Sequence, residues 1–562
     1  MKDVLEQKIA DACQALFAVG AKIELTRPEE QFGDFATNIA LQLSKQLAKN
    51  SREIGETLAA KLHETLAEQV AEVSVAGPGF INLKLTDTAL SEALQAKPAQ
   101  PLVDQTIVIE HTDANPFKAF HIGHAYSNTI GVSVGLLLQA AGATVHQVSY
   151  HGDVGMHIAM AVWALKKAYD KNPAILDDNQ QLTGARLATW LGQFYAEGAT
   201  AYKDNTTAKE QIESTNKLIY NQQDQDVNKL YEWGKARSFK YFGFLYDELS
   251  YDDGQQRIEV AFEKEYMESQ TGVIGKQVVQ EHVGSIFKKS DGAIVYEGEK
   301  VGLHTRVFIN SQDLPTYEAK EIGLVLEKQK DYPDAQQFIV ITANEIDEYF
   351  RVMKAAITEI DAELGDKLRH VSHGVVRLSS GKMSSRTGKV VQFIDILEEL
   401  KAAIHSEYPK ADTKLIANGA LKYSFLKHRL GSDLIFDLED SISLDGNSGP
   451  YLQYAHARAR SILRKAGDAA PKSPAAFEPG ERSLARKLAE YPEVIDKAAA
   501  ELMPHYICTY LYELAQVFNR FYEANRVIDD PRQPERLSLV SQYAEVLKQG
   551  LRLLGIAAPE QM

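Results

Sequence analysis

The sequence is 562 residues long, and its 44% hydrophobic and 25% charged residues are the proportions of an ordinary globular protein. This length is too great for one hydrophobic core and predicts about three domains. The excess of 77 acidic over 61 basic residues gives a net charge of −16, which argues against a non-specific nucleic-acid coat but leaves room for an RNA partner at a locally basic surface.

Residues 1–105 are predicted to form a small α+β domain. Helical periodicity of apolar residues occupies most of its first half. Two short alternating segments, 72–76 and 80–85, flank a Gly-Pro-Gly turn and predict a pair of strands. The proline-containing stretch 97–101 predicts a linker to the next domain.

Residues 106–400 are predicted to form a nucleotide-binding domain of the Rossmann type. Five short apolar runs, each associated with a helical pattern, predict a doubly wound parallel sheet. A mostly helical segment at about 165–300, rich in Lys, Gln, Asp and Tyr, is expected to be an insertion between two halves of the sheet. Ligands of such sheets bind where the strand order reverses, so we expect the ATP site at that point. The runs are residues 107–109, 145–148, 307–309, 338–341 and 374–377.

Residues 401–562 are predicted to form an all-α domain, because the apolar pattern is helical almost throughout. Two features of this domain allow either a structural or an RNA-binding interpretation. A basic strip lies on a solvated helix face or contacts RNA. An aromatic series at helical spacing could stack on unpaired bases, but this spacing fits a hydrophobic core better. The strip is His456, Arg458, Arg460, Arg464 and Lys465, and the series is Tyr510, Tyr512, Phe518, Phe521 and Tyr522.

The first motif that carries chemistry is Ala-Asn-Pro-Phe-Lys-Ala-Phe-His-Ile-Gly-His at residues 114–124, between a predicted strand and a predicted helix. At such a junction the exposed N–H groups and the dipole of the helix N-terminus can hold a nucleotide phosphate. His121 and His124 are three residues apart, so both rings can face the same phosphate. Gly123 leaves room for a base or a ribose to approach the backbone. Lys118 is a further candidate for a phosphate contact.

The second motif, at residues 379–389, is a polar loop with the sequence Ser-Ser-Gly-Lys-Met-Ser-Ser-Arg-Thr-Gly-Lys between two apolar runs. A lysine on such a loop, Lys382, suits the negative charge that develops on a leaving pyrophosphate. Met383, Ser384 and Ser385 are the neighbouring candidates for ATP binding. Together the two motifs predict a protein that joins a carboxylate to the α-phosphate of ATP.

The pair of motifs resembles the two hallmarks of class I aminoacyl-tRNA synthetases, and within that class the chain resembles the arginyl-tRNA synthetases nearly end to end. The resemblance implies a Rossmann-type catalytic domain, an N-terminal domain that contacts the elbow of the tRNA, and a C-terminal helical bundle that binds the anticodon. The sequence departs from the commonest pattern at Ser385, where a second lysine is usual, and Arg386 or Lys389 could supply that charge. The stretches that carry the resemblance are residues 32–38, 77–82, 114–124, 152–155, 315–317, 449–458, 553–556 and 559–562.

The resemblance also implies a pocket for arginine. A guanidinium is best matched by carboxylates and by aromatic or amide partners, and Tyr317 and Glu321, four residues apart, can share one helix face. The resemblance places both at the site of the substrate side chain, although the family usually has Asp at the position of Glu321. Glu110 and Asn115 match positions that hold the α-ammonium and carboxylate groups of the amino acid, and Glu345 is a weaker candidate.

The expected reaction converts ATP, L-arginine and tRNA(Arg) into AMP, diphosphate and arginyl-tRNA(Arg) through an arginyl-adenylate. ATP acts as substrate, and Mg²⁺ is expected with it, held mainly by phosphates and water. No stretch approaches ~18 consecutive apolar residues, so we expect no membrane contact. Only two cysteines occur, which favours the reducing cytoplasm. We also expect a monomer. Two alternatives stay open: another nucleotidyltransferase of the same superfamily, and a catalytically silent, synthetase-like RNA-binding protein.

Overall fold

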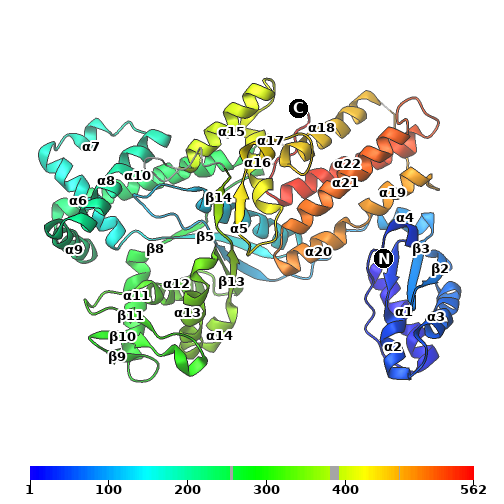
Figure 1. The fold of residues 1–562 in the computed structure, drawn as a ribbon, viewed down its shortest axis with the longest axis horizontal. Coiled ribbons are helices and arrows are strands. Elements are labelled where there is room, and N and C mark those ends of the chain that lie inside the picture. Colours follow the sequence, from blue (N-terminus) through cyan, green and yellow to red (C-terminus); the bar gives the residue numbers. More distant parts are fainter. Residues whose placement is uncertain (253–256, 380–391, 468) are drawn as a thin grey trace.

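The computed structural model describes residues 1–252, 257–379, 392–467 and 469–562. Its N-terminal domain packs helices against a three-stranded antiparallel sheet with the order β1-β3-β2 (Figure 1). Both expected strands are confirmed. The turn between them depends on Gly79, where φ is +126° and a Cβ would lie 2.8 Å from the carbonyl oxygen of Ser51. The elements are α1 (Lys2–Phe17), β1 (Phe35–Thr37), α2 (Ile39–Leu47), α3 (Ser51–Thr65), β2 (Val70–Ala76), β3 (Phe80–Leu85) and α4 (Asp87–Ala93).

A five-stranded sheet forms the centre of the molecule. Its order is β13-β12-β4-β5-β8, and all neighbouring strands are parallel. The chain starts in the middle with β4, adds β5 and β8 on one side, and then crosses over to add β12 and β13 on the other. The strand order therefore reverses between β4 and β12, where sheets of this class bind ligands at the carboxyl ends of the strands. The strands are β4 (Thr106–Glu110), β5 (Thr144–His151), β8 (Lys264–Met267), β12 (Ala335–Ala343) and β13 (Leu368–His373).

Two of the five apolar runs lie in other sheets. The run 307–309 is part of β11 in a small antiparallel sheet, where the ring of Phe308 packs against Phe287 and Tyr296. The run 374–377 overlaps β14, which pairs with β15. An apolar run indicates that a strand is buried, but it does not indicate which sheet the strand joins. The edge strands β8 and β13 were not predicted, because polar residues interrupt them. The further strands are β6 (Tyr251–Asp252), β7 (Arg257–Ile258), β9 (Lys288–Ser290), β10 (Ala293–Tyr296), β11 (Arg306–Ile309), β14 (Val376–Leu378) and β15 (Leu434–Phe436).

The helical insertion, α6 to α10, extends from one side of the catalytic domain (Figure 1). It begins before residue 165 and its last helix ends at Leu249, while β8 of the central sheet lies inside the expected range 165–300. That range was therefore too long, because the Lys-Glu-Tyr-Met sequence of β8 is as polar as the insertion around it. The helices of the catalytic domain are α5 (Ile122–Ala140), α6 (Met156–Lys171), α7 (Ile175–Asp178), α8 (Gly184–Asp204), α9 (Thr206–Asn221), α10 (Gln225–Leu249), α11 (Glu268–Glu281), α12 (Tyr317–Asp331), α13 (Asp347–Ile360) and α14 (Ala362–Lys367).

The C-terminal part of the chain is a helical bundle. Its first helix, α15, runs across residues 400 and 401, so the helical region begins before the expected boundary. None of the helices in the described ranges is long and apolar enough to cross a membrane. The helices are α15 (Phe393–Glu407), α16 (Thr413–Leu426), α17 (Leu438–Ile442), α18 (Gly449–Lys465), α19 (Pro479–Leu488), α20 (Tyr491–Glu501), α21 (His505–Ala524) and α22 (Gln533–Leu553).

Most of the aromatic series serves the core of this bundle. Tyr510, Phe518 and Phe521 are buried, and the ring of Phe518 stacks on Tyr543 with 3.8 Å between centroids. The basic strip is largely engaged within the protein as well. Arg460 donates to Glu560 at 2.8 Å, and other members of the strip bond to the carbonyl oxygens of Pro559 and Glu560. These contacts favour the structural interpretation of both features.

Residues 553–559 pass between the bundle and helix α5 of the catalytic domain. Ser133 of α5 donates to the carbonyl oxygen of Leu553 at 2.7 Å. The buried Lys422 of α16 donates to the carbonyl oxygens of Gly555 and Leu249 at 2.8 and 2.7 Å. This segment therefore joins the helix that follows β4 to both the bundle and the helical insertion.

Candidate active site

The loop between β4 and α5 carries backbone strain. Thr112, Asp113 and Phe117 have φ values of 82°, 45° and 62°, and positive φ is especially unusual for a β-branched residue. The loop is held by hydroxyl groups: the N–H of Thr112 donates to Ser127 at 3.2 Å, and that of Phe117 to Ser238 at 2.9 Å. Strain of about 1–3 kcal/mol per residue persists where surrounding contacts enforce it, and it is concentrated at functional sites.

The two histidines of the first motif lie together at the start of α5. His121 caps the helix, and its backbone N–H donates to Nδ1 of His124 at 3.2 Å. The two imidazole rings stack with 3.7 Å between centroids and 17° between planes. Gly123 lies beneath them, because a Cβ at this position would be 3.0 Å from the ring of His121. The small residue therefore allows the stacked pair to form.

The charge and tautomer of His124 follow from these contacts. Burial lowers the pKa of His124 well below its usual value, and the neighbouring His121 and Lys118 lower it further. The pKa of His121 is also lowered, first by desolvation within the surrounding protein and then by Lys118. Because Nδ1 of His124 accepts a hydrogen bond, the proton of its neutral ring lies on Nε2. The ring can thus donate to an anionic oxygen without a positive charge of its own.

Lys118 lies near the same histidines. Burial lowers the pKa of its ammonium, against the opposing effect of the Glu268 carboxylate. Lys118 in turn lowers the pKa of both imidazoles, so it acts electrostatically on the stacked pair, and its contact with phosphate oxygens stays a prediction.

The expected ATP-binding residues Lys382, Met383, Ser384 and Ser385 lie outside the described residues. The described chain on either side of them is anchored. On one side Ser379 bonds to Asp437 at 2.6 Å. On the other side the N–H of Phe393 donates to the carbonyl oxygen of Phe120 at 2.9 Å, and the two rings are 5.8 Å apart. The chain that carries the second motif therefore returns to the described structure directly beside His121.

A cavity of about 270 Å³ opens at the carboxyl ends of β4, β5 and β12. Of the residues expected to bind arginine, Glu110, Asn115, Tyr317 and Glu321 line it, and they come from β4, the loop after it, and α12. Tyr317 is 59% exposed and lies at the mouth. Glu345 is exposed and is not among the lining residues. The structure thus brings four of the five together.

The cavity has more negative than positive charge. Glu110 pairs with the buried Lys328 of α12, and the carboxylate of Glu268 pairs with Lys320 at 2.6 Å. Burial raises the pKa of Glu321 well above its usual value, and Glu110 raises it further. Burial also raises the pKa of Asp113 well above its usual value, and Glu110 again raises it further. A cationic ligand would relieve this repulsion.

Asn115 is oriented by the Gly-Asp-Val-Gly stretch that follows β5. Its side-chain oxygen accepts a hydrogen bond from the N–H of Gly152 at 2.9 Å. A Cβ at position 152 would lie 2.4 Å from the same oxygen, so only glycine allows the contact. Asp153, next along the chain, is fully buried and accepts hydrogen bonds from Tyr231 and Ser269, which fixes the stretch on α10 and α11.

Sequence reasoning missed several lining residues. Asp113 stands directly before the first motif and Tyr150 two residues before Gly152, so their proximity to recognised stretches was an available signal. Glu268 and Tyr349 lie on α11 and α13 without any local pattern that marks them. Only the crossover between the two halves of the sheet brings these helices to the cavity.

Three known domain families match the chain. Residues 2–85 match the arginyl tRNA synthetase N terminal domain, residues 86–438 the catalytic domain of tRNA synthetases class I (R), and residues 452–562 the DALR anticodon binding domain. The chain belongs to the arginyl-tRNA synthetase family. Within this family, the parallel catalytic sheet, the N-terminal domain and the helical C-terminal domain of the chain confirm the expected class I architecture.

Relatives of this arginyl-tRNA synthetase family member match it over the full length. The arginine–tRNA ligases of Flavobacterium psychrophilum and Parabacteroides distasonis are 29% and 28% identical, over 100% of both chains in each case. The arginyl-tRNA synthetase structure from Thermus thermophilus matches with a TM-score of 0.80 and 25% identity over 100% of both chains. That from Plasmodium falciparum has the same fold, with a TM-score of 0.78, at 20% identity over 100% of this chain and 99% of the other.

Proposed function

We propose that this protein ligates L-arginine to tRNA(Arg) through an arginyl-adenylate. The observation that carries the proposal is the juxtaposition of two unlike sites at one edge of the sheet. Neutral imidazoles at the start of α5 suit phosphate oxygens, and the acidic cavity beside β4 and β12 suits a cationic amino acid. Holding both substrates at this edge turns a bimolecular reaction into an effectively intramolecular one.

In the first step an oxygen of the arginine carboxylate attacks the α-phosphorus of ATP. The bond from the α-phosphorus to the bridging oxygen breaks, and pyrophosphate leaves with the electron pair. No protein nucleophile is needed, because the substrate supplies it. His124 donates from Nε2 to a phosphate oxygen, and His121 and Lys118 stabilise the charge of the same phosphates.

The second motif completes the ATP site in this proposal. Lys382 accompanies the β- and γ-phosphates as pyrophosphate departs, while Met383, Ser384 and Ser385 contact ATP. The support for this assignment is the anchoring of Phe393 on Phe120, which returns the chain beside the histidines. Mg²⁺ enters with ATP as part of the substrate, coordinated mainly by phosphate oxygens and water.

The charge of the cavity favours a cationic amino acid. One lysine, Lys328, acts on the three carboxylates of Glu110, Asp113 and Glu321. The two remaining negative charges match the two positive charges of an arginyl group whose carboxylate is joined to AMP. Glu321 receives the guanidinium from one side and Tyr317 covers it at the mouth.

The other end of the substrate lies near the strand edge. Glu110 and Asn115 hold the α-ammonium and carboxylate groups, with Glu345 as a more distant candidate. In the second step a terminal ribose hydroxyl of tRNA attacks the carbonyl carbon of the adenylate and AMP leaves. The N-terminal domain contacts the tRNA elbow and the C-terminal bundle its anticodon, and the protein acts as a cytoplasmic monomer.

The test is pyrophosphate exchange into ATP with each amino acid, with and without bulk tRNA. We expect exchange with arginine, dependent on tRNA. Exchange driven better by lysine, glutamine or cysteine would refute the arginine assignment. A complete lack of exchange and of aminoacylation would favour a catalytically silent RNA-binding protein instead.

A further inference from the structure

The N-terminal domain is attached to the C-terminal bundle. In the described chain, the hydrogen bonds and ion pairs that involve a side chain and leave residues 1–93 reach residues 474–493, which form α19, the start of α20 and the loop before them. Figure 1 shows the same arrangement, with the N-terminal domain beside α19 and α20 and far from α11 to α14. The two parts of the chain that flank the catalytic domain in sequence are therefore neighbours in space.

Arg482 of α19 lies at the centre of this contact. Its two terminal nitrogens donate to Asp34 at 2.6 Å and to Asp87 at 2.8 Å, and one of them also donates to the carbonyl oxygen of Leu85 at 3.0 Å. Asp34 is only 2% exposed and also accepts a hydrogen bond from the N–H of Leu85 at 2.7 Å. The planar guanidinium is thus fixed by acceptors from both β3 and α4.

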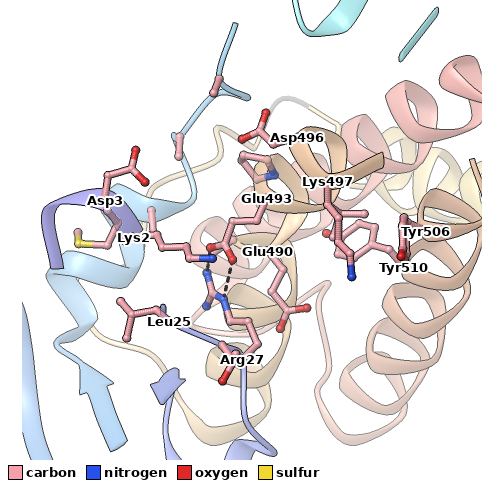
Figure 2. A pocket seen from close by; sticks show the side chains of 18 of the residues that line it. Lys2, Asp3, Leu25, Arg27, Glu490, Glu493, Asp496, Lys497, Tyr506 and Tyr510 are labelled. Carbon is pink, nitrogen blue, oxygen red and sulfur yellow. Dashed lines mark hydrogen bonds and ion pairs between the residues drawn. The ribbon is translucent and has the colours of Figure 1, made fainter. Parts of the chain in front are cut away.

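Neighbouring contacts extend this interface into a polar seam, by which we mean the ion pairs of Arg482, Arg486 and Arg27 between the two domains. Arg486, one turn further along α19, lies 3.5 Å from the other carboxylate oxygen of Asp34. Arg27 pairs with Glu493 of α20 at 2.6 Å, as the dashed lines in Figure 2 show. Beside this pair the two domains separate around a cavity of about 960 Å³, lined by residues of the N-terminal domain, α20 and α21 (Figure 2). The domain is therefore held along a polar seam rather than across its whole facing surface.

A seam of this kind specifies geometry more than it adds stability. Buried ion pairs give little net stabilisation, because desolvation offsets their attraction, but a guanidinium held by two carboxylates permits one relative orientation. Two binding modules joined at a fixed spacing also bind a shared ligand much more tightly than two that move independently.

We propose that Arg482 is a positioning residue for tRNA. By fixing the N-terminal domain on α19, it makes this domain and the bundle one rigid surface that spans the tRNA from elbow to anticodon. The proposal rests on the proposed function, since it assigns both domains to one RNA. It predicts that loss of the seam weakens tRNA binding while the catalytic domain keeps its substrate sites.

The test compares the variant Arg482→Gln with the parent in steady-state aminoacylation. Loss of fixed spacing should raise the KM for tRNA about 10- to 100-fold, while the KM values for arginine and ATP stay within about twofold. Arg257→Gln is the matched control, because Arg257 lies in the catalytic domain, outside the two domains assigned to tRNA, and its guanidinium pairs locally with Glu259 at 2.7 Å. Protease cleavage between residues 94 and 105 reports undocking directly and should increase only in Arg482→Gln.

A second variant separates positioning from general damage. Asp34→Asn in the Arg482→Gln background removes the buried carboxylate that the first change leaves unpaired, so it should restore part of the tRNA affinity. If Arg482→Gln loses its folding transition, Arg482→Lys, which keeps the charge without the fork, replaces it in the same comparison. An unchanged KM for tRNA, or an equal rise of all three KM values, would overturn the proposal. A parent protein without aminoacylation would instead refute the proposed function.

Discussion

Glu321→Gln is the substitution that tests the arginine pocket most directly. The amide keeps the shape of the side chain and removes its charge. In the free protein this carboxylate lines the cavity close to Glu110 and Asp113, whose partner Lys328 is already engaged by Glu110. A hydrogen bond to a charged group contributes about 1.5–3 kcal/mol, so the KM for arginine should rise about 10- to 150-fold.

The assay is aminoacylation at saturating tRNA with arginine and ATP varied in turn. The proposed ATP site is at the start of α5 rather than on α12, so the KM for ATP should stay within about twofold of the parent value. Glu327→Gln is the control, because Glu327 is on the same helix but pairs with Lys330 and does not line the cavity. An unchanged KM for arginine, or an equal rise for ATP, would refute the reasoning.

The carboxylate of Glu321 also predicts that stability and arginine affinity depend on pH. Its folded-state pKa is raised above the ordinary value of 4.5, so its ionisation destabilises the fold as pH rises from 4.5 through the folded pKa. Bound arginine favours the ionised form, so binding releases protons and the affinity for arginine should increase with pH. Calorimetry of arginine binding in buffers of different ionisation enthalpy measures this release, which should shrink in Glu321→Gln. Equal release by parent and variant would show that another group titrates.

Three further substitutions test other parts of the site. His124→Ala removes a donor to the transferring phosphate and should lower kcat about 10²–10³-fold; single-turnover rates close to the parent would contradict this role. Lys328→Met leaves Glu110 buried without its partner and should destabilise the protein by about 3–5 kcal/mol, and an unchanged melting temperature at pH 7 would show that the pair is dispensable. Gly152→Ala displaces the oxygen of Asn115 and should raise the KM for arginine about tenfold with little change in melting temperature, as a small overpacking at a binding site does; a parent-like KM would mean that Asn115 is not needed in its present orientation.

The sequence predicted those parts of the molecule that local pattern determines. The strand-turn-helix junction at His121 and the Gly-Pro-Gly hairpin were predictable because neighbouring residues specify them. Which strands join one sheet was not, since β11 is as apolar as β12 and shares a hydrophobic core with it, yet β11 pairs in a separate sheet. An edge strand such as β8 pairs with a neighbour on one side only, so it is less buried and its sequence lacks the apolar run that marks a central strand.

The residues of the pocket also divide into those that the sequence could predict and those that it could not. Glu110, Asn115, Tyr317 and Glu321 were found because the resemblance to a known family assigned them, and the structure brings them to one cavity. Tyr349 could not be found, because its role depends on where α13 packs. The tautomer of His124 was equally inaccessible, since it depends on a backbone N–H three residues earlier.

The hydrogen bond between Ser133 and the carbonyl oxygen of Leu553 spans 420 residues of sequence. During synthesis on the ribosome, the helix that carries the two histidines therefore emerges long before the segment that covers its far side. Its packing is completed only when residues 553–559 have been made. A nascent chain of this protein should consequently expose part of that helix until very late in translation. Until then, chaperones are its natural protection.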